Sequence, residues 1–357
     1  MEYYKCMKQV IPTHIILDKN NLFLLKFSGG GFFLNVLEIR ELKTYFQTQE
    51  GTAKAVDGVS LSAKRGEILG LVGESGCGKS ALALSILRLV PQPPAFFAGG
   101  QILFEGQDLL HLGKEEMRRL RGNRISMIFQ EPMTALNPVF TIGNQLSEVF
   151  QVHQGLNHSQ ALNQSIEMLK MVGVPAPERR IKEYPYQLSG GMRQRVMIAM
   201  ALACQPILLL ADEPTTALDV TIQAQILDLI LKLRDEFDTT VVLITHDLGV
   251  VAETTERVAV MYTGKIVEEA ETVTLFDEPL HPYTQGLLAA IPSVEAEIEN
   301  RELHEIKGVV PSLTNLPSGC NFAPRCHLRE SICDEKEPEL VEIQPGHRVA
   351  CWRIGHG

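Results

Sequence analysis

Short apolar runs that end in polar or glycine-rich residues predict the strands of an α/β protein. They span residues 68–72, 125–129, 207–211 and 240–244, and unbroken apolar runs of this length are typical of strands buried on both faces of a parallel sheet. Apolar residues at helical spacing fall between and after these runs, over residues 81–89, 114–120, 159–172 and 220–233. Strands that alternate with helices in this order favour a largely parallel sheet covered by helices.

The N-terminal part of the chain follows other patterns. Residues 36–46 and 59–63 alternate between apolar and polar positions, which predicts a small antiparallel part before the first buried strand. Residues 1–35 hold only interrupted apolar stretches, so we expect a poorly ordered N-terminal extension, with a signal peptide as the alternative. No stretch reaches the roughly 20 apolar residues that a membrane span needs.

A glycine-rich segment, GESGCGKS at residues 73–80, joins the first apolar run to a helical run. Glycines at this spacing turn tightly without a Cβ, so that backbone N–H groups and a helix N-terminus face one anion. Lys79 would then reach the β- and γ-phosphates of a nucleotide, and the Ser80 hydroxyl would bind Mg²⁺. The order of strand, loop and helix favours this prediction over a chance turn. The predicted nucleotide-binding residues here are Gly73, Glu74, Ser75, Gly76, Cys77, Gly78, Lys79 and Ser80.

Polar side chains follow three of the apolar runs directly. Gln130 follows the second run, Asp212 and Glu213 follow the third, and His246 comes just after the fourth. Ligands of open α/β sheets bind at the carboxyl ends of the strands. We therefore predict that Asp212 holds Mg²⁺ together with Ser80 and Gln130. We also predict that Glu213 is the base for the attacking water, with His246 and Gln130 completing the catalytic set.

Two predicted helix N-termini carry residues that could either cap the helix or bind a ligand. Ser189, in the segment LSGGM, is a typical N-cap, and Gly190 and Gly191 leave N–H groups uncovered at the positive end of a helix. Asp219 stands in the same way before the helical run 220–233. Each pattern alone is as typical of simple capping as of ligand binding.

Charge and cysteine content narrow the possible functions. The chain of 357 residues is 45% hydrophobic and 21% charged, as in ordinary globular proteins, and is long enough for two domains. Its net charge of −10 argues against nucleic acid as the main partner. Four of its seven cysteines lie in the last 38 residues, with the spacing C-x5-C-x6-C-x17-C. Grouped thiols in a reducing compartment suggest a metal site before they suggest disulfides.

The phosphate loop, Gln130, LSGGM, ILLLADE, ALD and THD, in this order over residues 36–275, resemble the nucleotide-binding domain of ABC transporters. The resemblance implies a P-loop ABC ATPase core with an antiparallel β subdomain and a helical subdomain at about residues 131–190. It also implies a dimer, in which residues of one copy bind the ATP held by the phosphate loop of an identical or related ATPase. The residues with this expected role are Ser189, Gly190, Gly191 and Asp219.

Two further sites follow from the resemblance alone. An aromatic residue before the first core strand would stack on adenine, and either Phe46 or Tyr45 is available, because residues 47–54 form a longer connection than is usual in the family. Residues 131–138 correspond to the surface that receives a coupling helix from a membrane subunit. The ATPase would therefore act peripherally at the cytoplasmic face of the cell membrane, with two membrane-spanning permease subunits.

The C-terminal region, residues 276–357, is similar to the tail of ATPases from dipeptide and oligopeptide permeases, with nickel permeases close by. The similarity implies ATP-driven uptake of peptides that an extracytoplasmic binding protein delivers. D-type subunits with such a tail carry a [4Fe-4S] cluster, which is the expected role of the tail cysteines, and zinc or unligated thiols are the alternatives. The expected ligands are Cys320, Cys326, Cys333 and Cys351.

Two other functions fit the residues less well. Repair ATPases of this type insert long coiled coils between the phosphate loop and LSGGM, whereas only the 107 residues 81–187 intervene here, and translation factors usually carry two cassettes. A binding module that has lost hydrolysis would lack part of the predicted catalytic set, and that set is complete.

Overall fold

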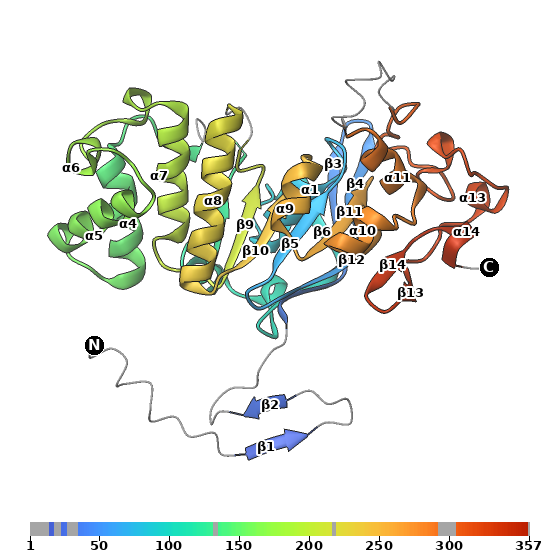
Figure 1. Ribbon diagram of the computed structural model, residues 1–357, viewed down its shortest axis with the longest axis horizontal. Helices are drawn as coiled ribbons and strands as arrows, with labels where there is room; N and C mark the ends of the chain where they lie inside the picture. Colours follow the sequence, from blue (N-terminus) through green and yellow to red (C-terminus); the bar gives the residue numbers. More distant parts are fainter. Residues whose placement is uncertain are drawn as a thin grey trace.

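The computed structural model describes residues 14–17, 23–26, 35–130, 135–215, 219–291 and 305–355. Figure 1 shows a sheet in the middle of the molecule, with the helices α4, α5 and α6 at one end and the C-terminal region at the other. No helix within the described residues has both the length and the apolar character to cross a membrane.

The central sheet has eight strands, and five of them are parallel, in the order β11-β5-β10-β9-β8. Every residue of β5, β8, β9 and β10 is buried. This confirms the predicted α/β core, in which strands covered on both faces need no alternation. The strands span Ile68–Val72 (β5), Ile125–Ile128 (β8), Leu208–Asp212 (β9), Thr240–Ile244 (β10) and Arg257–Tyr262 (β11).

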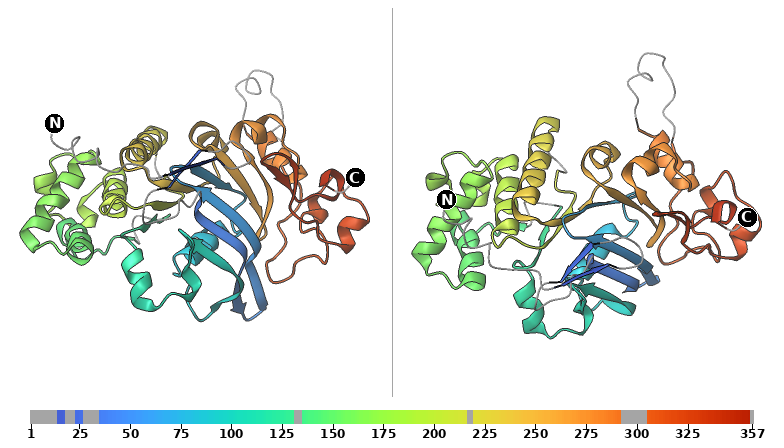
Figure 2. Two further views of the ribbon diagram at one scale, coloured as in Figure 1. Left: turned by 90° about the horizontal axis from the view of Figure 1, so that it is seen from below. Right: turned by 60° about the horizontal axis from the view of Figure 1, so that its bottom comes forward.

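A second, antiparallel sheet has the order β4-β3-β6-β7. In Figure 2 its strands, coloured blue to teal, lie below the yellow and orange helices. The strands are β3 (Asn35–Thr48), β4 (Gly51–Lys64), β6 (Ala95–Phe104) and β7 (Gln107–Asp108). The segment 47–54, interpreted as a long connection, is the tip of a hairpin, because Thr48 pairs with Gly51. Its residues are mostly exposed, so no apolar alternation marks them as strand.

Helices pack around the central sheet and contribute to three apolar clusters within the described residues, the third of which holds Val251 of α9. Leu82 of α1 belongs to the first cluster, beside the antiparallel sheet, and Leu209 of β9 belongs to the second, with Ile198 of α7 and Phe150 of α4. The helices are α1 (Lys79–Ile86), α2 (Lys114–Leu120), α4 (Ile142–Gln154), α5 (His158–Met171), α6 (Pro177–Arg180), α7 (Gly190–Leu202), α8 (Val220–Phe237) and α9 (Leu248–Thr254). The expected membrane-subunit surface lies partly outside the described residues, at 131–134.

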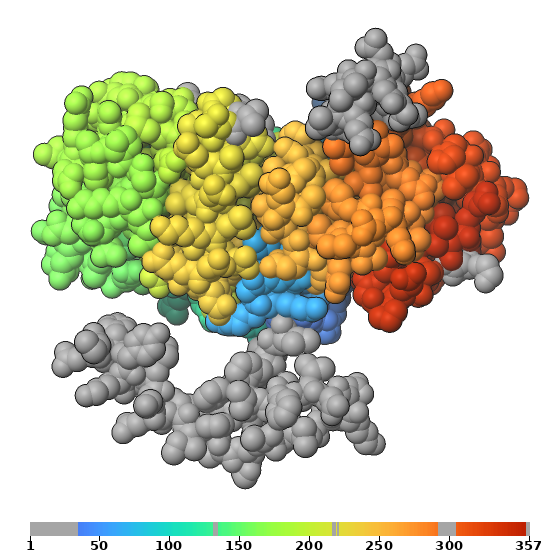
Figure 3. Space-filling view, viewed as in Figure 1, coloured from blue at the N-terminus to red at the C-terminus, as the bar shows by residue number. Residues whose placement is uncertain are grey.

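The C-terminal region extends the central sheet. Strand β14 (His347–Val349) pairs with β12 (Lys265–Glu271), and β13 (Val341–Gln344) pairs with β14, so strand pairing crosses the expected boundary at residue 275. The fully buried Glu268 of β12 joins the two parts, because it accepts hydrogen bonds from the backbone of Leu280 and His281 and lies 2.8 Å from His347 Nε2. In the space-filling view the red C-terminal region abuts the orange segment (Figure 3).

Short helices complete this region, and a hairpin lies at the other terminus. The helices are α10 (Thr272–Asp277), α11 (Pro282–Ala289), α13 (Ile332–Glu335) and α14 (Trp352–Gly355). Within the expected N-terminal extension, β1 (His14–Leu17) and β2 (Phe23–Lys26) pair in antiparallel fashion. The rest of residues 1–34 lies outside the described residues.

Candidate functional site: a nucleotide-binding edge

The phosphate loop connects β5 to α1 through three glycines with positive φ angles. Gly73 and Gly78 have φ angles of 152° and 110°, where L-residues are strained. A Cβ on Gly73 would overlap the carbonyl oxygen of Met261, and one on Gly78 would overlap that of Ala55. Both obstacles are backbone atoms of neighbouring strands, so these two positions require glycine.

Lys79, the first residue of α1, is buried and folds back over the loop. Its Nζ donates hydrogen bonds to the carbonyl oxygens of Gly73, at 2.7 Å, and Glu74, at 3.1 Å. The ammonium is therefore held at the mouth of the loop, where the phosphates of a nucleotide would bind. Cys77 is buried beneath it, and burial raises the pKa of its thiol, as expected for a packing residue.

Ser80 and Asp212, two of the three predicted ligands of Mg²⁺, contact each other, whereas the third, Gln130, donates to Glu213. The Ser80 hydroxyl hydrogen-bonds to the carboxyl group of Asp212, whose pKa is raised chiefly by burial. Asp212 is 4% exposed, and its Oδ1 has no hydrogen-bond partner in the described structure. A buried carboxylate oxygen without a partner is costly unless a cation compensates it, and Mg²⁺ prefers oxygen ligands of this kind. These two residues therefore fit the ion.

Glu213 lies between the other two residues of the predicted catalytic set. Its Oε2 accepts a hydrogen bond from Gln130 Nε2 at 2.7 Å, and its Oε1 lies 3.1 Å from His246 Nδ1. The three residues follow the carboxyl ends of β9, β8 and β10, which are adjacent in the sheet. Glu213 has a φ of 46°, an uncommon conformation for a non-glycine residue that often marks a functional site. The structure thus brings these three residues together, and their catalytic role stays a prediction.

Ser189 and Asp219 cap the helices that follow them. Ser189 Oγ accepts from the backbone N–H of Met192 at 3.4 Å, and Asp219 Oδ1 accepts from that of Ile222 at 3.0 Å. Gly191 lets α7 approach α8, because a Cβ there would lie 3.1 Å from Ile222 Cγ2. Both caps are exposed, and no hydrogen bond joins either of them to the phosphate loop within the part of the chain that the structure describes. Their expected role towards a second copy stays a prediction.

The two candidate adenine-stacking residues lie side by side in β3, so their side chains point to opposite faces of the sheet. Tyr45 donates a hydrogen bond from its hydroxyl to Asp57 Oδ1 at 2.5 Å and makes an edge contact with Phe96. Burial and this hydrogen bond raise the pKa of Tyr45. Phe46 is half-buried. The choice between them stays open.

The tail cysteines lie near one another but not in a metal-binding arrangement. Burial raises the pKa of Cys320 to about 11 and also raises that of Cys326 and Cys351, and the nearby Cys333 adds to the rise in all three. Within the described ranges, however, no group of three or more His, Cys, Asp or Glu side chains is placed to hold a metal ion. The expected iron–sulfur or zinc site therefore finds no support in the described residues.

Two residues that contact the phosphate loop were missed from the sequence. Tyr283 in α11 and Arg325 in the C-terminal region both bind Glu74. Both lie in residues 276–357, whose sequence indicates only a likeness to the tails of peptide-permease ATPases. A contact between residues 251 positions apart leaves no local pattern that could reveal it.

Comparisons with known proteins agree with this geometry. Residues 56–216 match the family described as ABC transporter, and residues 267–333 match the family described as oligopeptide/dipeptide transporter, C-terminal region. The chain is 55% identical over 318 residues to the probable peptide ABC transporter ATP-binding protein y4tR of Sinorhizobium fredii, covering 89% of this chain and 95% of that protein. It is 51% identical over 317 residues to the oligopeptide transport ATP-binding protein AppD of Bacillus subtilis, covering 89% and 96%.

A solved structure has the same core. The dimeric post-hydrolysis state of the ATP-binding cassette MJ0796, bound to ADP and Pi, matches with a TM-score of 0.60 and 30% identity, and covers 66% of this chain and 98% of that one. The core fold, the arrangement of the predicted site residues and the relatives matched over 89% of the chain agree. The chain belongs to the ABC transporter family, among the ATP-binding subunits of peptide transporters.

Proposed function

We propose that the chain is the ATP-hydrolysing subunit of an importer of dipeptides or oligopeptides, bound peripherally to permease subunits at the cytoplasmic face of the membrane. The observation that carries the proposal is Glu213, held by Gln130 and His246 beside the Ser80–Asp212 pair. A purely structural carboxylate would not need two polar partners gathered at the ligand-binding edge of the sheet.

The residues divide the reaction between them. The backbone N–H groups of the phosphate loop and Lys79 would bind the β- and γ-phosphates, and Ser80 and Asp212 would hold Mg²⁺. Mg²⁺, when bound, supplies positive charge to the phosphate oxygens. Glu213 accepts a proton as the oxygen of a water attacks the γ-phosphorus, and the bond to the bridging oxygen breaks to give ADP and phosphate. Gln130 and His246 hold its carboxylate towards that water.

We propose further that the working unit is a dimer of ATPases, in which Ser189, Gly190, Gly191 and Asp219 of one copy contact the ATP of the other. The N-terminus of α7 supports this role, because Ser189 is exposed and, among the described residues, its side chain is the one cap given for the N–H groups there. Light scattering of the Glu213→Gln chain should show doubling of mass with MgATP. Ser189→Arg should prevent the doubling, and Ser159→Arg, at an exposed serine of α5, should not.

The cargo is proposed from the C-terminal match and the named relatives. An extracytoplasmic binding protein would deliver it, and nucleic acid would have no part, as the net charge of −10 suggests. Vesicles that hold the chain with its permease partners should accumulate labelled dipeptide only with ATP. Accumulation of nickel without peptide would favour the alternative cargo, and tight binding of DNA or RNA at physiological salt would oppose both.

We propose that the four cysteines of the C-terminal region bind a [4Fe-4S] cluster, with zinc as the alternative. The match of residues 267–333 to the oligopeptide/dipeptide transporter C-terminal region supports the proposal, and the ion or cluster would have to bring the thiols into ligand positions. Its part would be to brace the tail. Iron, sulfide and zinc analysis of anaerobically purified protein, compared with Cys320→Ser, tests this proposal, and a protein free of all three would end it.

A further inference from the structure

The C-terminal region reaches the phosphate loop at Glu74. Arg325 forms a two-point ion pair with the carboxylate of Glu74, with its Nη1 2.6 Å from Oε2 and its Nη2 3.0 Å from Oε1. The hydroxyl of Tyr283 accepts a hydrogen bond from the backbone N–H of Glu74 at 2.8 Å. A residue inside the nucleotide-binding loop is therefore held by its side chain and by its backbone, and both partners lie outside the ATPase core as the sequence predicts it.

Arg325 is fixed independently of Glu74. Its side chain is 3% exposed, and its guanidinium lies 5.9 Å from the ring centres of both Tyr262 and Phe322. It also donates to the backbone carbonyl oxygens of Ile306 and Lys307. Because these contacts already orient the planar guanidinium group, little side-chain entropy is lost when it binds both oxygens of a carboxylate.

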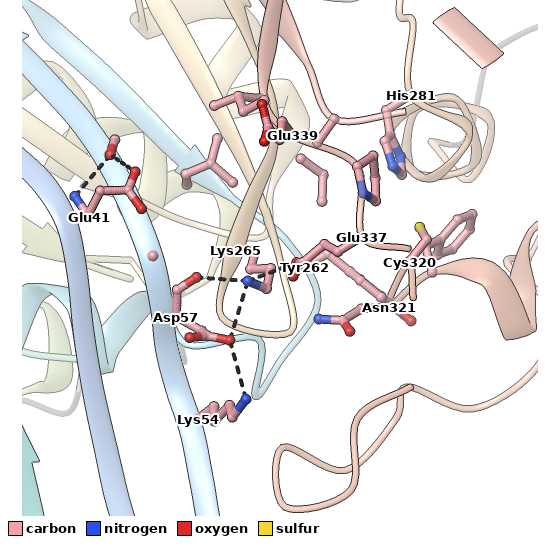
Figure 4. A pocket seen from close by; sticks show the side chains of 18 of the residues that line it. Glu41, Lys54, Asp57, Tyr262, Lys265, His281, Cys320, Asn321, Glu337 and Glu339 are labelled. Carbon is pink, nitrogen blue, oxygen red and sulfur yellow. Dashed lines mark hydrogen bonds and ion pairs between the residues drawn. The ribbon is translucent and has the colours of Figure 1, made fainter. Parts of the chain in front are cut away.

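The segment that carries Arg325 is anchored to the core at other points. A pocket of about 730 Å³ lies between the strands of the core and the tail. In Figure 4, Lys265 reaches across it towards Glu337. Lys265 Nζ lies 2.8 Å from Glu337 Oε1 and also donates to the backbone of Asp57. Nearby, the backbone N–H of Lys54 donates to the carbonyl oxygen of Leu313. The tail thus holds Arg325 at a set position against the loop.

Glu74 matters to the loop in two ways. Its carbonyl oxygen accepts from Lys79 Nζ, so the peptide groups on both sides of its Cα are tied, one to Lys79 and the other to Tyr283. Its carboxylate also places a negative charge in a loop that must receive a triphosphate. Unpaired, that charge would repel the nucleotide, and Arg325 neutralises it.

We propose that Arg325 and Tyr283 are positioning residues of the ATP site, which shape the phosphate loop through Glu74 and cancel its charge. The affinity of the core for MgATP then depends on the C-terminal region. This inference rests on the proposed function only in taking ATP as the ligand.

The test measures MgATP binding by calorimetry, with the full chain in the Glu213→Gln background to prevent turnover. Arg325→Met keeps an apolar stem against the two rings and should weaken binding about tenfold, within the usual range for coupled sites. Adding Glu74→Gln should recover most of this loss, because it removes the charge left unpaired. Tyr283→Phe, which deletes one acceptor from a buried ring, should weaken binding about threefold.

The outcomes distinguish a failure of this inference from a failure of the proposed function. Arg329→Gln, which removes an exposed ion pair with Asp334 in the same region, is the control and should bind MgATP normally. An unchanged dissociation constant in Arg325→Met, or a double variant as weak as the single one, would overturn the inference, since a merely structural role gives no recovery. If Arg325→Met does not fold, an unchanged constant in Tyr283→Phe overturns it. A parent chain that does not bind MgATP would instead refute the proposed function.

Discussion

Replacing Glu213 by glutamine should stop hydrolysis and leave nucleotide binding intact. The carboxamide oxygen of glutamine can still accept a hydrogen bond from Gln130 Nε2, and its NH₂ group can face His246 Nδ1. Both contacts, at 2.7 and 3.1 Å in the native chain, can therefore be replaced. What disappears is a group able to accept a proton near neutral pH. General-base catalysis contributes about 10²–10⁴-fold, which corresponds to about 3 to 5 kcal/mol on the activation barrier.

The assay is phosphate release by the chain assembled with its permease subunits. We expect kcat to fall at least about a hundredfold and the dissociation constant for MgATP to change less than about twofold. Glu115→Gln, at an exposed glutamate of α2, is the matched control and should retain normal turnover. A Glu213→Gln chain that hydrolyses ATP at the normal rate would refute the assignment of the base.

Three further predictions follow from the same edge of the sheet. Burial raises the pKa of Asp212, so the folded chain holds this proton more tightly than the unfolded chain and should lose stability as pH rises from the unfolded to the folded pKa. In thermal unfolding without Mg²⁺, Asp212→Asn should flatten that slope, and an unchanged slope would contradict the reasoning. Gly78→Ala should abolish MgATP binding in calorimetry because its Cβ overlaps the Ala55 carbonyl, whereas Gly99→Ala, with open space around it, should bind normally. His246→Ala should lower kcat about tenfold to a hundredfold in the phosphate-release assay with little change in affinity, and a kcat within about twofold of normal would exclude a catalytic part for it.

The core strands, and the meeting of the predicted site residues at one edge of the sheet, could be predicted because their determinants are local. A strand buried on both faces must be continuously apolar, and the first polar residue after it marks the edge where ligands bind. Asp212 and Glu213 stand at such a break, and Gln130 and His246 stand at two others. Parallel neighbours then bring the three breaks together without any further information.

The C-terminal region could not be predicted in the same way. Strand β13 is largely exposed, and β14 has only three residues, so neither carries an apolar pattern long enough to read as part of a sheet. Cysteine spacing along the sequence could not predict whether the folded thiols are placed to hold a metal, and in the described residues they are not. The Arg325–Glu74 pair depends on the packed structure of two distant segments, which no periodicity records.

The pairing of β12 with β14 has a consequence for the size of the smallest independent folding unit. A chain cut after residue 275 would keep all the proposed catalytic residues. It would, however, make β12 an exposed edge strand that can pair with strands of other molecules. It would also leave the buried carboxylate of Glu268 without its partners, which are His347 and the backbone N–H groups of Leu280 and His281. A truncated ATPase made for biochemistry should therefore aggregate, and a well-behaved fragment has to run at least through Ala350, which donates its backbone N–H to Val267.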